Sequence, residues 1–355
     1  MNYDVIICGG GPAGSVCAAF CAASGLKTLV IEKAVFPREK VCGDCINPSC
    51  WPILERLNLA GRVLTLAHSR LGEVEFIGIG GRSIRFPLHS SARGEIAVKR
   101  GLFDSLLLQR AVECGAEVRQ GTAVTGVGRG WNVRSGEEAF TAPNLVAADG
   151  RNSTVLRLLG LLAPAARERV AIQAHIPAPR DFGERVVLRF LPEGYCGYCS
   201  VGGEQLNLCL VAIPRGIPAL KLWASRHFSV TPDQPWRTIT PLARKPVPAF
   251  GDNLVLVGDA ARVVEPFTGE GIYYALASGE LAAKYLCEKL PFADYRREHA
   301  CLYSNRLWVN RISKHAAIRP RLASLALEAM RFYPPALRFL ASKVLGAAMA
   351  GIAGS

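Results

Sequence analysis

The sequence predicts an α/β fold that combines a Rossmann-like dinucleotide-binding domain with an antiparallel β-sheet and C-terminal helices. The first observation is a strand–helix–strand unit at the start of the chain, with a glycine-rich turn after its first strand. The second is a set of three short apolar runs that each end in a glycine or an acidic residue. The third is a β-rich region over residues 170–212. Short apolar runs are typical of parallel strands that are buried on both faces.

The strand–helix–strand unit starts with the apolar run Val5–Ile7. We expect a helix over residues 15–24 and a second strand over residues 28–31. The second strand finishes at Glu32, whose carboxylate can accept hydrogen bonds from ribose hydroxyls. The unit therefore has the order of elements that a dinucleotide site requires.

The turn between the first strand and the helix reads Gly9-x-Gly11-x-x-Gly14. Gly9 permits a tight turn, Gly11 lets the backbone approach a pyrophosphate, and Gly14 lets the helix pack closely on the strand. The N-terminus of the helix then faces the phosphate charge. Because strands, helix and terminal acid all agree with this spacing, another kind of glycine-rich turn is disfavoured.

Two further apolar runs end in a similar way. Residues 144–148 lead to an Asp-Gly pair, and residues 253–257 lead to a Gly-Asp pair. In a doubly wound sheet the carboxyl ends of the strands meet at one crevice, where ligands bind. We therefore expect one extended ligand that is contacted by three separate parts of the chain.

The other elements are predicted from periodicity and from the positions of glycine and proline. In chain order they are a loop over residues 33–45, a short helix over 52–59, hairpins over 71–98, a helix over 100–114, a β-meander over 122–140, strands within 170–212, a proline-rich connection with one short helix over 213–250, and helices over 270–289 and 294–317.

The composition limits the class of protein and its partners. The chain has 355 residues, of which 50% are hydrophobic and 20% charged, so it can bury a large core. Its net charge of +13 favours an acidic ligand or an anionic lipid. No nucleic acid is expected, because no nucleic-acid motif or basic run is present. The 12 cysteines, in a chain without secretory features, predict a reducing and therefore cytoplasmic compartment.

Four motifs together carry a resemblance to a known family. They stand at residues 9–14 (GGGPAG), 36–44 (FPREKVCGD), 148–155 (ADGRNSTV) and 258–283 (beginning GDAA). With them the chain resembles the geranylgeranyl-reductase-like flavoproteins, within the superfamily of FAD-dependent class A aromatic hydroxylases and flavin halogenases. The resemblance covers roughly residues 1 to 285. It implies FAD as cofactor and a para-hydroxybenzoate-hydroxylase-like FAD-binding domain of the GR2 type.

The resemblance also implies which residues contact FAD. The glycine-rich turn would hold the pyrophosphate, Glu32 the adenosine ribose, and the segment 266–272 the isoalloxazine ring, with a helix N-terminus that stabilises charge on reduced flavin. For Arg100, an exposed arginine in a first helical turn is the alternative. The full set is Gly9, Gly11, Pro12, Ala13, Gly14, Glu32, Lys33, Lys40, Cys42, Arg100, Asp149, Gly258, Asp259, Pro266, Gly269, Glu270, Gly271 and Ile272.

Two residues are catalytic candidates by resemblance. Cys42 matches the cysteine of the family's Cys-Gly motif, where a thiol would donate a proton to a flavin-reduced double bond, or would only shape the pocket. Tyr195 matches the first residue of a Tyr-x-Trp-x-Phe-Pro segment that lines the lipid channel of many prenyl reductases. The Trp, Phe and Pro of that segment are not kept here.

No metal is expected. Cys42-x-x-Cys45 and Cys196-x-x-Cys199 could together form a four-cysteine zinc site, but one pair lies in the flavin loop and the other in the distant β-rich region. The histidines show no metal-ligand spacing.

Three activities remain open from the sequence. The favoured one is reduction of a carbon–carbon double bond in a hydrophobic isoprenoid or lipid by FAD, with NAD(P)H or another reductant bound transiently, because no second nucleotide fingerprint is present. The first alternative is an NAD(P)H- and O2-dependent monooxygenase that hydroxylates or epoxidises an aromatic, polyketide or lipid substrate. The second is a non-catalytic lipid-binding escort on a flavoprotein fold. The oligomeric state is not indicated.

We expect three structural parts. Residues 1–70, 96–165 and 246–300 would form a discontinuous FAD-binding domain, and residues 71–95 and 166–245 a substrate-binding β-sheet domain. Residues 301–355 would form a C-terminal helical region. Pro334 would kink or break the basic, amphipathic helix expected over 321–352, which would either pack on the FAD-binding domain or contact the inner membrane face peripherally.

Overall fold

The first sheet is parallel and five-stranded, with the order β20-β12-β1-β2-β8. In the computed structural model, residues 2–88, 91, 93–166, 169–248, 251 and 253–330 are described. All four neighbouring strand pairs of this sheet run parallel. The predicted α/β fold is therefore confirmed, and the three apolar runs lie side by side. The strands are β1 (Val5–Cys8), β2 (Thr28–Ile31), β8 (Glu117–Arg119), β12 (Asn144–Ala147) and β20 (Leu254–Leu256).

Both faces of the parallel sheet are covered, which explains why its central strands are mainly apolar, whereas the edge strand β8 carries Glu117 and Arg119. Helices α1 (Pro12–Ala23), α4 (Arg100–Glu113) and α7 (Gly271–Cys287) pack on one face. The meander β9–β11 (residues 126–141) and helix α5 (Thr154–Leu158) cover the other. Helix α1 begins at residue 12, earlier than predicted, because proline suits the first turn of a helix.

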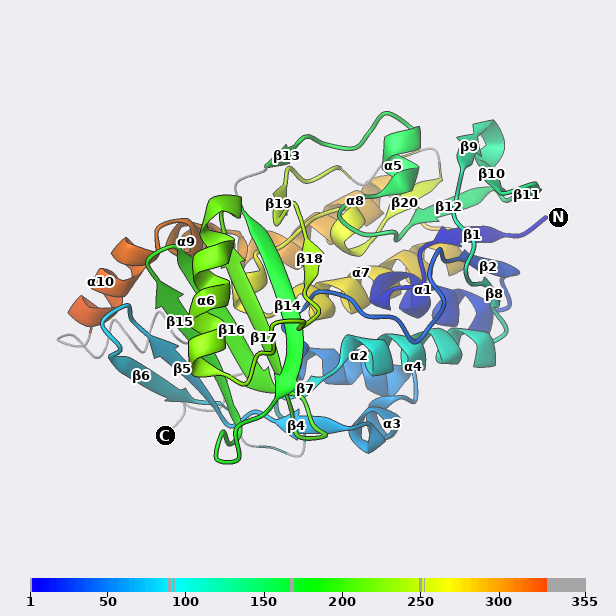
Figure 1. The fold of residues 1–355 in the computed structure, drawn as a ribbon. Helices are drawn as coiled ribbons and strands as arrows, with labels where there is room; N and C mark the ends of the chain where they lie inside the picture. Colours follow the sequence, from blue (N-terminus) through cyan, green and yellow to red (C-terminus); the bar gives the residue numbers. More distant parts are fainter. Residues whose placement is uncertain are drawn as a thin grey trace.

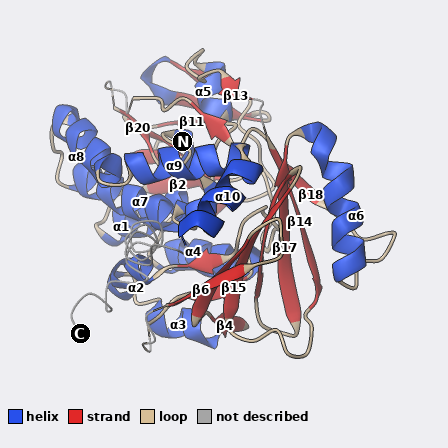
Figure 2. Cartoon of the chain, turned by 90° about the vertical axis from the view of Figure 1, so that its left-hand side faces the viewer, coloured by secondary structure: helices blue, strands red, loops and turns tan. Residues whose placement is uncertain are grey.

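The second large sheet has seven strands in the order β18-β14-β17-β16-β15-β5-β6. It is antiparallel except for the parallel pair of β15 and β5. Helix α6 (Ile217–His227) covers one face, and Figure 1 and Figure 2 show it on the outer side of this sheet. The strands are β5 (Glu73–Ile77), β6 (Ser83–Pro87), β14 (Val170–Pro177), β15 (Arg185–Leu191), β16 (Gly194–Ser200), β17 (Gln205–Ala212) and β18 (Arg237–Ile239).

Smaller elements join the two large sheets. Strands β3 (Cys45–Ile46), β7 (Ile96–Val98) and β4 (His68–Arg70) form a short sheet that anchors the end of the 33–45 loop. Helices α2 (Trp51–Arg56) and α3 (Ala60–Thr65) lie between β3 and β4 along the chain. The pair β13 (Ala165–Ala166) and β19 (Ala243–Arg244) is antiparallel.

Three helices follow α7 in the described part of the chain. They are α8 (Phe292–Ser304), α9 (Leu307–Ile318) and α10 (Pro320–Met330). The prediction of one helix over 294–317 was wrong, because a turn at residues 305–306 separates helix α8 from helix α9. The predicted helix beyond residue 330 lies outside the described residues. Among the helices that the structure describes, none is long and apolar enough to cross a membrane.

Candidate functional site

The carboxyl ends of β1, β12 and β20 meet at one edge of the parallel sheet. Ala148 N donates to Cys8 O at 2.8 Å, and Val257 N donates to Ala147 O at 3.1 Å. Gly258 N donates to Ser278 Oγ of α7 at 2.9 Å, which ties the third strand end to the helix that follows it. The predicted crevice is thus a physical junction of three chain segments.

The glycines of the first turn have different roles. A Cβ on Gly14 would lie 1.9 Å from Gly9 O, and one on Gly9 would lie 2.5 Å from Ala148 O, so packing within the protein requires both glycines. A Cβ on Gly11 would have its nearest neighbour, the Arg38 Nη2 atom, at 3.5 Å. Gly11, at the N-cap of α1, therefore leaves room for a ligand rather than for the protein's own atoms.

The acidic residues at the strand ends are already engaged by the protein. Glu32 accepts from Gly10 N at 2.7 Å and from Ala34 N at 2.9 Å. Asp149 accepts from the backbone N–H groups of Thr154 and Val155, at 2.6 and 3.0 Å, and so caps helix α5. A carboxylate has about four acceptor positions, so Glu32 can still accept from a ribose.

A cluster of four cations lies beside the crevice. Arg100 forms two hydrogen bonds of 2.7 Å with the fully buried Asp104, whose carboxylate also lies 3.1 Å from Arg38. Asp259 accepts from Arg151 Nη2 at 2.7 Å. We call this set the cation cluster, and it consists of Arg38, Lys40, Arg100 and Arg151.

The charge of the cation cluster is not balanced by the two acids. Burial and the neighbouring Arg151, Arg100 and Arg38 lower the pKa of Lys40 to about 8, although Asp259 opposes the shift. An anion between these cations would relieve their repulsion. The pyrophosphate of FAD is an anion of this kind, so the residues present fit this cofactor. Arg38 and Arg151 were not selected from the sequence, although both lie within recognised motifs.

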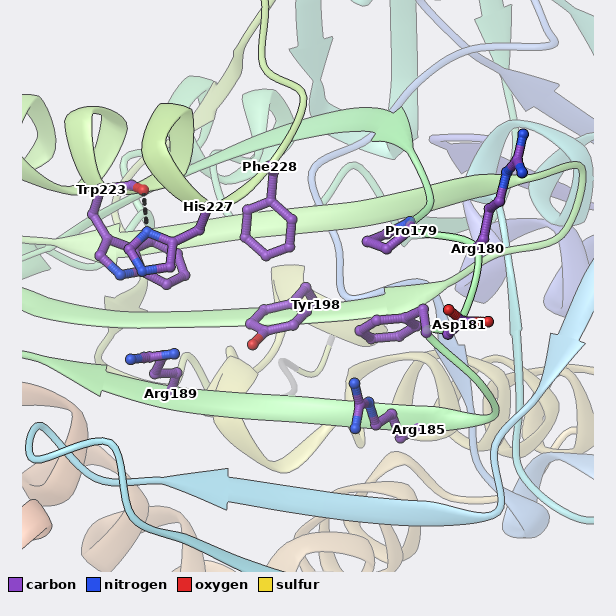
Figure 3. Close-up of a pocket in the computed structure, with 10 residues that line it drawn as sticks. Pro179, Arg180, Asp181, Arg185, Arg189, Tyr198, Trp223, His227 and Phe228 are labelled. Atoms are coloured by element: carbon purple, nitrogen blue, oxygen red, sulfur yellow. Dashed lines mark hydrogen bonds between the residues drawn. The ribbon is translucent and has the colours of Figure 1, made fainter.

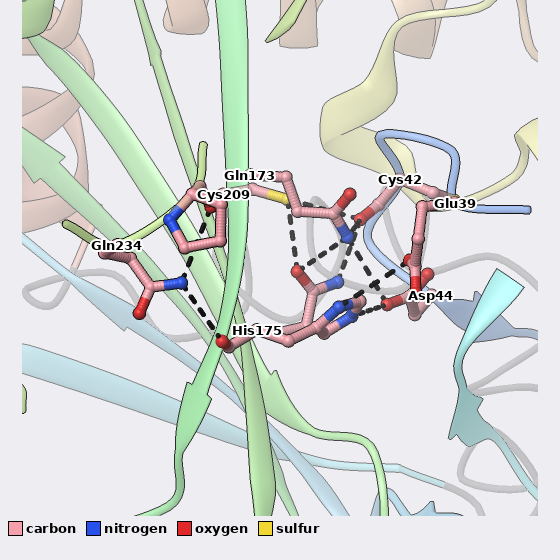
Figure 4. Close-up of polar contacts among 9 residues, drawn as sticks. Glu39, Cys42, Asp44, Gln173, His175, Cys209 and Gln234 are labelled. Atoms are coloured by element: carbon pink, nitrogen blue, oxygen red, sulfur yellow. Dashed lines mark hydrogen bonds and ion pairs between the residues drawn. The ribbon is translucent and has the colours of Figure 1, made fainter. Parts of the chain in front are cut away.

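The loop that carries Cys42 is fixed to the seven-stranded sheet. The Cys42 carbonyl accepts from Gln173 Nε2 at 2.9 Å, Asn207 Nδ2 at 2.8 Å and the Cys209 thiol at 3.2 Å. Figure 4 shows Cys42 facing Gln173 and Cys209. Arg100 lies near this thiol and acts to lower its pKa, but burial outweighs the arginine and raises the pKa. The half-buried Cys42 thiol is therefore neutral at neutral pH.

An Asp–His pair supports the same loop. Asp44 is fully buried with a positive φ of 60°, and its Oδ2 accepts from His175 Nε2 at 2.8 Å (Figure 4). His175 was not selected from the sequence. The available signal was Gln173 and His175 alternating with apolar residues in one strand, because β14 and β17 turn these polar side chains toward the loop.

An aromatic cluster adjoins the loop. The Phe267 ring lies 5.3 Å from Tyr195, 6.0 Å from Phe190 and 6.3 Å from Phe76, measured between ring centroids. Val41, next to Cys42, packs against the same apolar group. Burial raises the pKa of the Tyr195 hydroxyl well beyond its usual range, so Tyr195 lies in the apolar group as a neutral side chain.

The segment that leads into α7 is shaped by glycine and an ion pair. The short helix η5 (Pro266–Thr268) ends at Gly269, which has a left-handed φ of 68°. Glu270 then pairs with Arg306 at 2.9 Å, and Gly271 and Ile272 begin α7. The N–H groups of the first turn of α7 are thereby positioned to face negative charge.

The comparison with protein families identifies the chain's class. The family described as FAD binding domain matches residues 2–183. The chain belongs to this family. It is an FAD-dependent oxidoreductase with a Rossmann-like flavoprotein fold.

Its relatives include a protein named as a receptor and several reductases. Conditioned medium factor receptor 1 of Dictyostelium discoideum is 27% identical over 85% of this chain and 67% of that protein. Menaquinone reductase of Mycolicibacterium smegmatis is 30% identical over 80% of this chain and 76% of that protein. A digeranylgeranylglycerophospholipid reductase of Thermoplasma acidophilum is 28% identical over 83% of this chain and 80% of that protein.

Solved structures share the fold of this flavoprotein. The flavin-dependent brominase Bmp2 superposes with a TM-score of 0.78 at 21% identity, over 98% of this chain and 94% of that chain. A geranylgeranyl bacteriochlorophyll reductase-like protein of Thermoplasma acidophilum gives a TM-score of 0.70 at 24% identity, over 99% and 94%.

Some predicted site residues of the flavoprotein do not converge. Lys33 is exposed at the surface, apart from the cation cluster. The thiols of Cys45 and Cys199 lie beside each other, but Cys196 points into the core beneath α6. The four cysteines therefore form no common site, and no group of three potential metal ligands is found among the described residues.

Proposed function

We propose that this flavoprotein reduces a carbon–carbon double bond of a hydrophobic isoprenoid or lipid, with NAD(P)H or another reductant as electron source. The observation that carries the proposal is the position of Cys42. The charge of Arg100 in the cation cluster acts on its thiol, while its neighbour Val41 packs into the aromatic cluster around Phe267. A proton donor would thus lie where the proposed cofactor site borders an apolar region.

Different residues would bind different parts of the cofactor. The backbone of residues 9–14, together with Lys40, would hold the FAD pyrophosphate, and Glu32 would accept from the ribose. The first turn of α7 would face the isoalloxazine ring, where its N–H groups stabilise negative charge.

FAD, when bound and reduced, supplies a hydride to one carbon of the double bond. The other carbon then requires a proton, which the neutral Cys42 thiol donates as its S–H bond breaks. Arg100 would stabilise the thiolate that remains, because its positive charge lies near that sulfur. The Asp44–His175 pair and the bonds to the Cys42 carbonyl hold the thiol in position.

The apolar side of the site indicates the substrate class. The inner face of the seven-stranded sheet presents the apolar side chains of Ala171, Phe190, Tyr195 and Val211 to Phe267, and the buried charges near Tyr195 neutralise each other in the Arg169–Glu265 ion pair. Such a surface binds hydrocarbon rather than a polar metabolite. The names of the relatives, menaquinone reductase and digeranylgeranylglycerophospholipid reductase, support a lipid-soluble substrate.

A lipid-soluble substrate also suggests contact with a membrane surface. Helices α9 and α10 leave a row of large apolar side chains exposed, with arginines nearby in the sequence. This combination is typical of helices that lie in a membrane interface. The exposed side chains are Leu307, Trp308, Ile312, Ile318, Leu322 and Leu325.

Anaerobic turnover tests the reaction. Reduced protein is incubated without oxygen with menaquinone or a digeranylgeranylglycerophospholipid, and the product mass is measured. A gain of two hydrogens per double bond supports the reductase. A reaction that occurs only after oxygen is admitted, with a gain of one oxygen atom, would show the monooxygenase instead. No product under either condition would leave a binding role and contradict the proposal.

The Cys42→Ser variant tests the proton donor. A serine hydroxyl is a far weaker acid, so the rate should fall by about a hundredfold while FAD content stays unchanged. Cys301→Ser, at an exposed cysteine, is the matched control and should behave like wild type. If Cys42→Ser lowers the thermal midpoint but leaves the rate intact, the residue serves packing only.

A further inference from the structure

A pocket of about 310 Å³ opens on the outer face of the seven-stranded sheet, beneath α6 (Figure 3). Its walls come from α6, from strands β15 and β16, and from the loop between β14 and β15. The flavin side of the sheet is the opposite face, because Tyr195 and Phe190 point there while Tyr198 and Arg189 point into the pocket. The pocket is therefore separate from the proposed active site.

Aromatic rings form much of the wall. The Tyr198 ring lies 5.8 Å from Phe182 and 5.1 Å from Phe228, and Phe228 lies 5.7 Å from Trp223. The rings meet edge to face or tilted, so they present both edges and faces to the cavity. A flat aromatic body can add to this arrangement through the same contacts.

The Arg189 side chain in the pocket has no acidic partner. The Arg189 guanidinium lies 5.4 Å from the centre of the Trp223 ring, and its buried Nε has no hydrogen-bond partner. No carboxylate pairs with Arg189 among the residues that the structure describes. Arg185 differs, because Glu75 lies 3.4 Å from it. Asp181 also lines the pocket, but Figure 3 shows it at the opposite end from Arg189.

We propose that this pocket binds an organic anion with a flat aromatic body. The anionic group of this ligand would be a carboxylate that binds Arg189, because the planar guanidinium can donate two parallel hydrogen bonds to it. The ring would lie against Tyr198 and Phe228. A neutral ligand would leave the Arg189 charge without a counter-ion, so the site selects for the anion.

Titration of the FAD-loaded protein with 1-naphthoate tests the proposal. Calorimetry should give a Kd below about 1 mM, with quenching of tryptophan fluorescence that is lost in Trp223→Phe. The flavin absorbance should not change, because the pocket lies across the sheet. Neutral 1-naphthalenemethanol should bind at least about tenfold more weakly than 1-naphthoate.

Two variants test whether 1-naphthoate binds in this pocket rather than elsewhere on the protein. Arg189→Gln should weaken 1-naphthoate binding at least about tenfold. Arg180→Gln is the matched control, because Figure 3 shows the Arg180 side chain pointing away from the rings, and it should change the Kd less than about threefold. The proposal is overturned if 1-naphthoate does not bind, if it perturbs the flavin absorbance, or if Arg189→Gln binds it as wild type does. The comparison with the neutral analogue uses wild-type protein only, so it holds even if a variant folds poorly.

Discussion

Lys40 shows how the site is prepared for an anion at the scale of one residue. Its pKa is lowered to about 8 from an ordinary value of 10.5, by burial and by three neighbouring arginines. A bound pyrophosphate would favour the charged ammonium and raise that pKa again. Binding of FAD should therefore take up a proton at Lys40.

This linkage predicts a pH dependence of FAD affinity. Below pH 8 Lys40 is already charged in the free protein, whereas above pH 8 binding must protonate it, so affinity falls as pH rises. The Kd for FAD should increase about tenfold between pH 7 and pH 9. Fluorescence titration of apoprotein measures it. Lys40→Met should bind FAD more weakly at pH 7 and lose this dependence, whereas an unchanged slope in the variant would contradict the assignment.

Individual residues were predictable from sequence only where a motif or the family resemblance marked them. Cys42 and Arg100 were both selected, and the structure places the charge of Arg100 near the Cys42 thiol. Gln173, His175 and Asn207 were not, because their role depends on which face of β14 and β17 receives the flavin loop. The contact between the flavin loop and these strands joins residues more than 100 positions apart, and local sequence patterns do not predict it.

At the scale of elements, helices α1 and α7 are held together by a close contact of their backbones. A Cβ on Gly279 would lie 2.3 Å from the carbonyl oxygen of Ala13. The glycine therefore lets α7 approach the first turn of α1, beside the proposed pyrophosphate site. Separation of the two helices would disturb the packing and the cofactor turn together.

Gly279→Ala should lower the free energy of unfolding by about 1–3 kcal/mol, because the added methyl group forces the helices apart. Urea unfolding measures this change, and flavin content should fall with it. Gly61→Ala is the control, since a Cβ there meets nothing within 4 Å and alanine favours the helix. Equal stability of the two variants would show that the α1–α7 contact is not tight.

Some helices and strands were predictable from the sequence and others were not, depending on how clear a local pattern each one leaves. The apolar strands β1, β2, β12 and β20 were predicted within a residue or two, because strands buried on both faces leave a short apolar run. The break between α8 and α9 was not predicted, because no proline or glycine marks residues 305–306. Strand β16 was not predicted as a separate strand, since its two glycines and two cysteines weaken the strand pattern.

At the scale of the whole molecule, the proposed membrane contact concerns how a lipid reaches the site. Helix α10 packs one side on the second sheet, where Ile79 N donates to Ser324 Oγ at 2.9 Å. Leu322 and Leu325 on the same helix remain 57% and 62% exposed. The helix is thus held by one side and free to contact lipid with the other.

Co-sedimentation with anionic liposomes tests this contact. The double variant Leu322→Ser and Leu325→Ser should remain folded and pellet at least about threefold less than wild type, because less apolar area enters the interface. Leu222→Ser, which changes a leucine of 53% exposure on α6, is the control and should pellet as wild type does. Equal pelleting of all three proteins would contradict the proposal.

We propose that three strand ends form one FAD site, and the flavin occupancy of the Gly11→Val variant tests this proposal. A side chain at Gly11 finds space within the protein, since its nearest neighbour would be the flexible Arg38 at 3.5 Å, so the variant should fold. The same side chain would occupy the position proposed for the pyrophosphate. We predict a folded protein, with wild-type circular dichroism, that purifies with less than about a tenth of the wild-type flavin. A yellow Gly11→Val protein with full FAD occupancy would contradict the account.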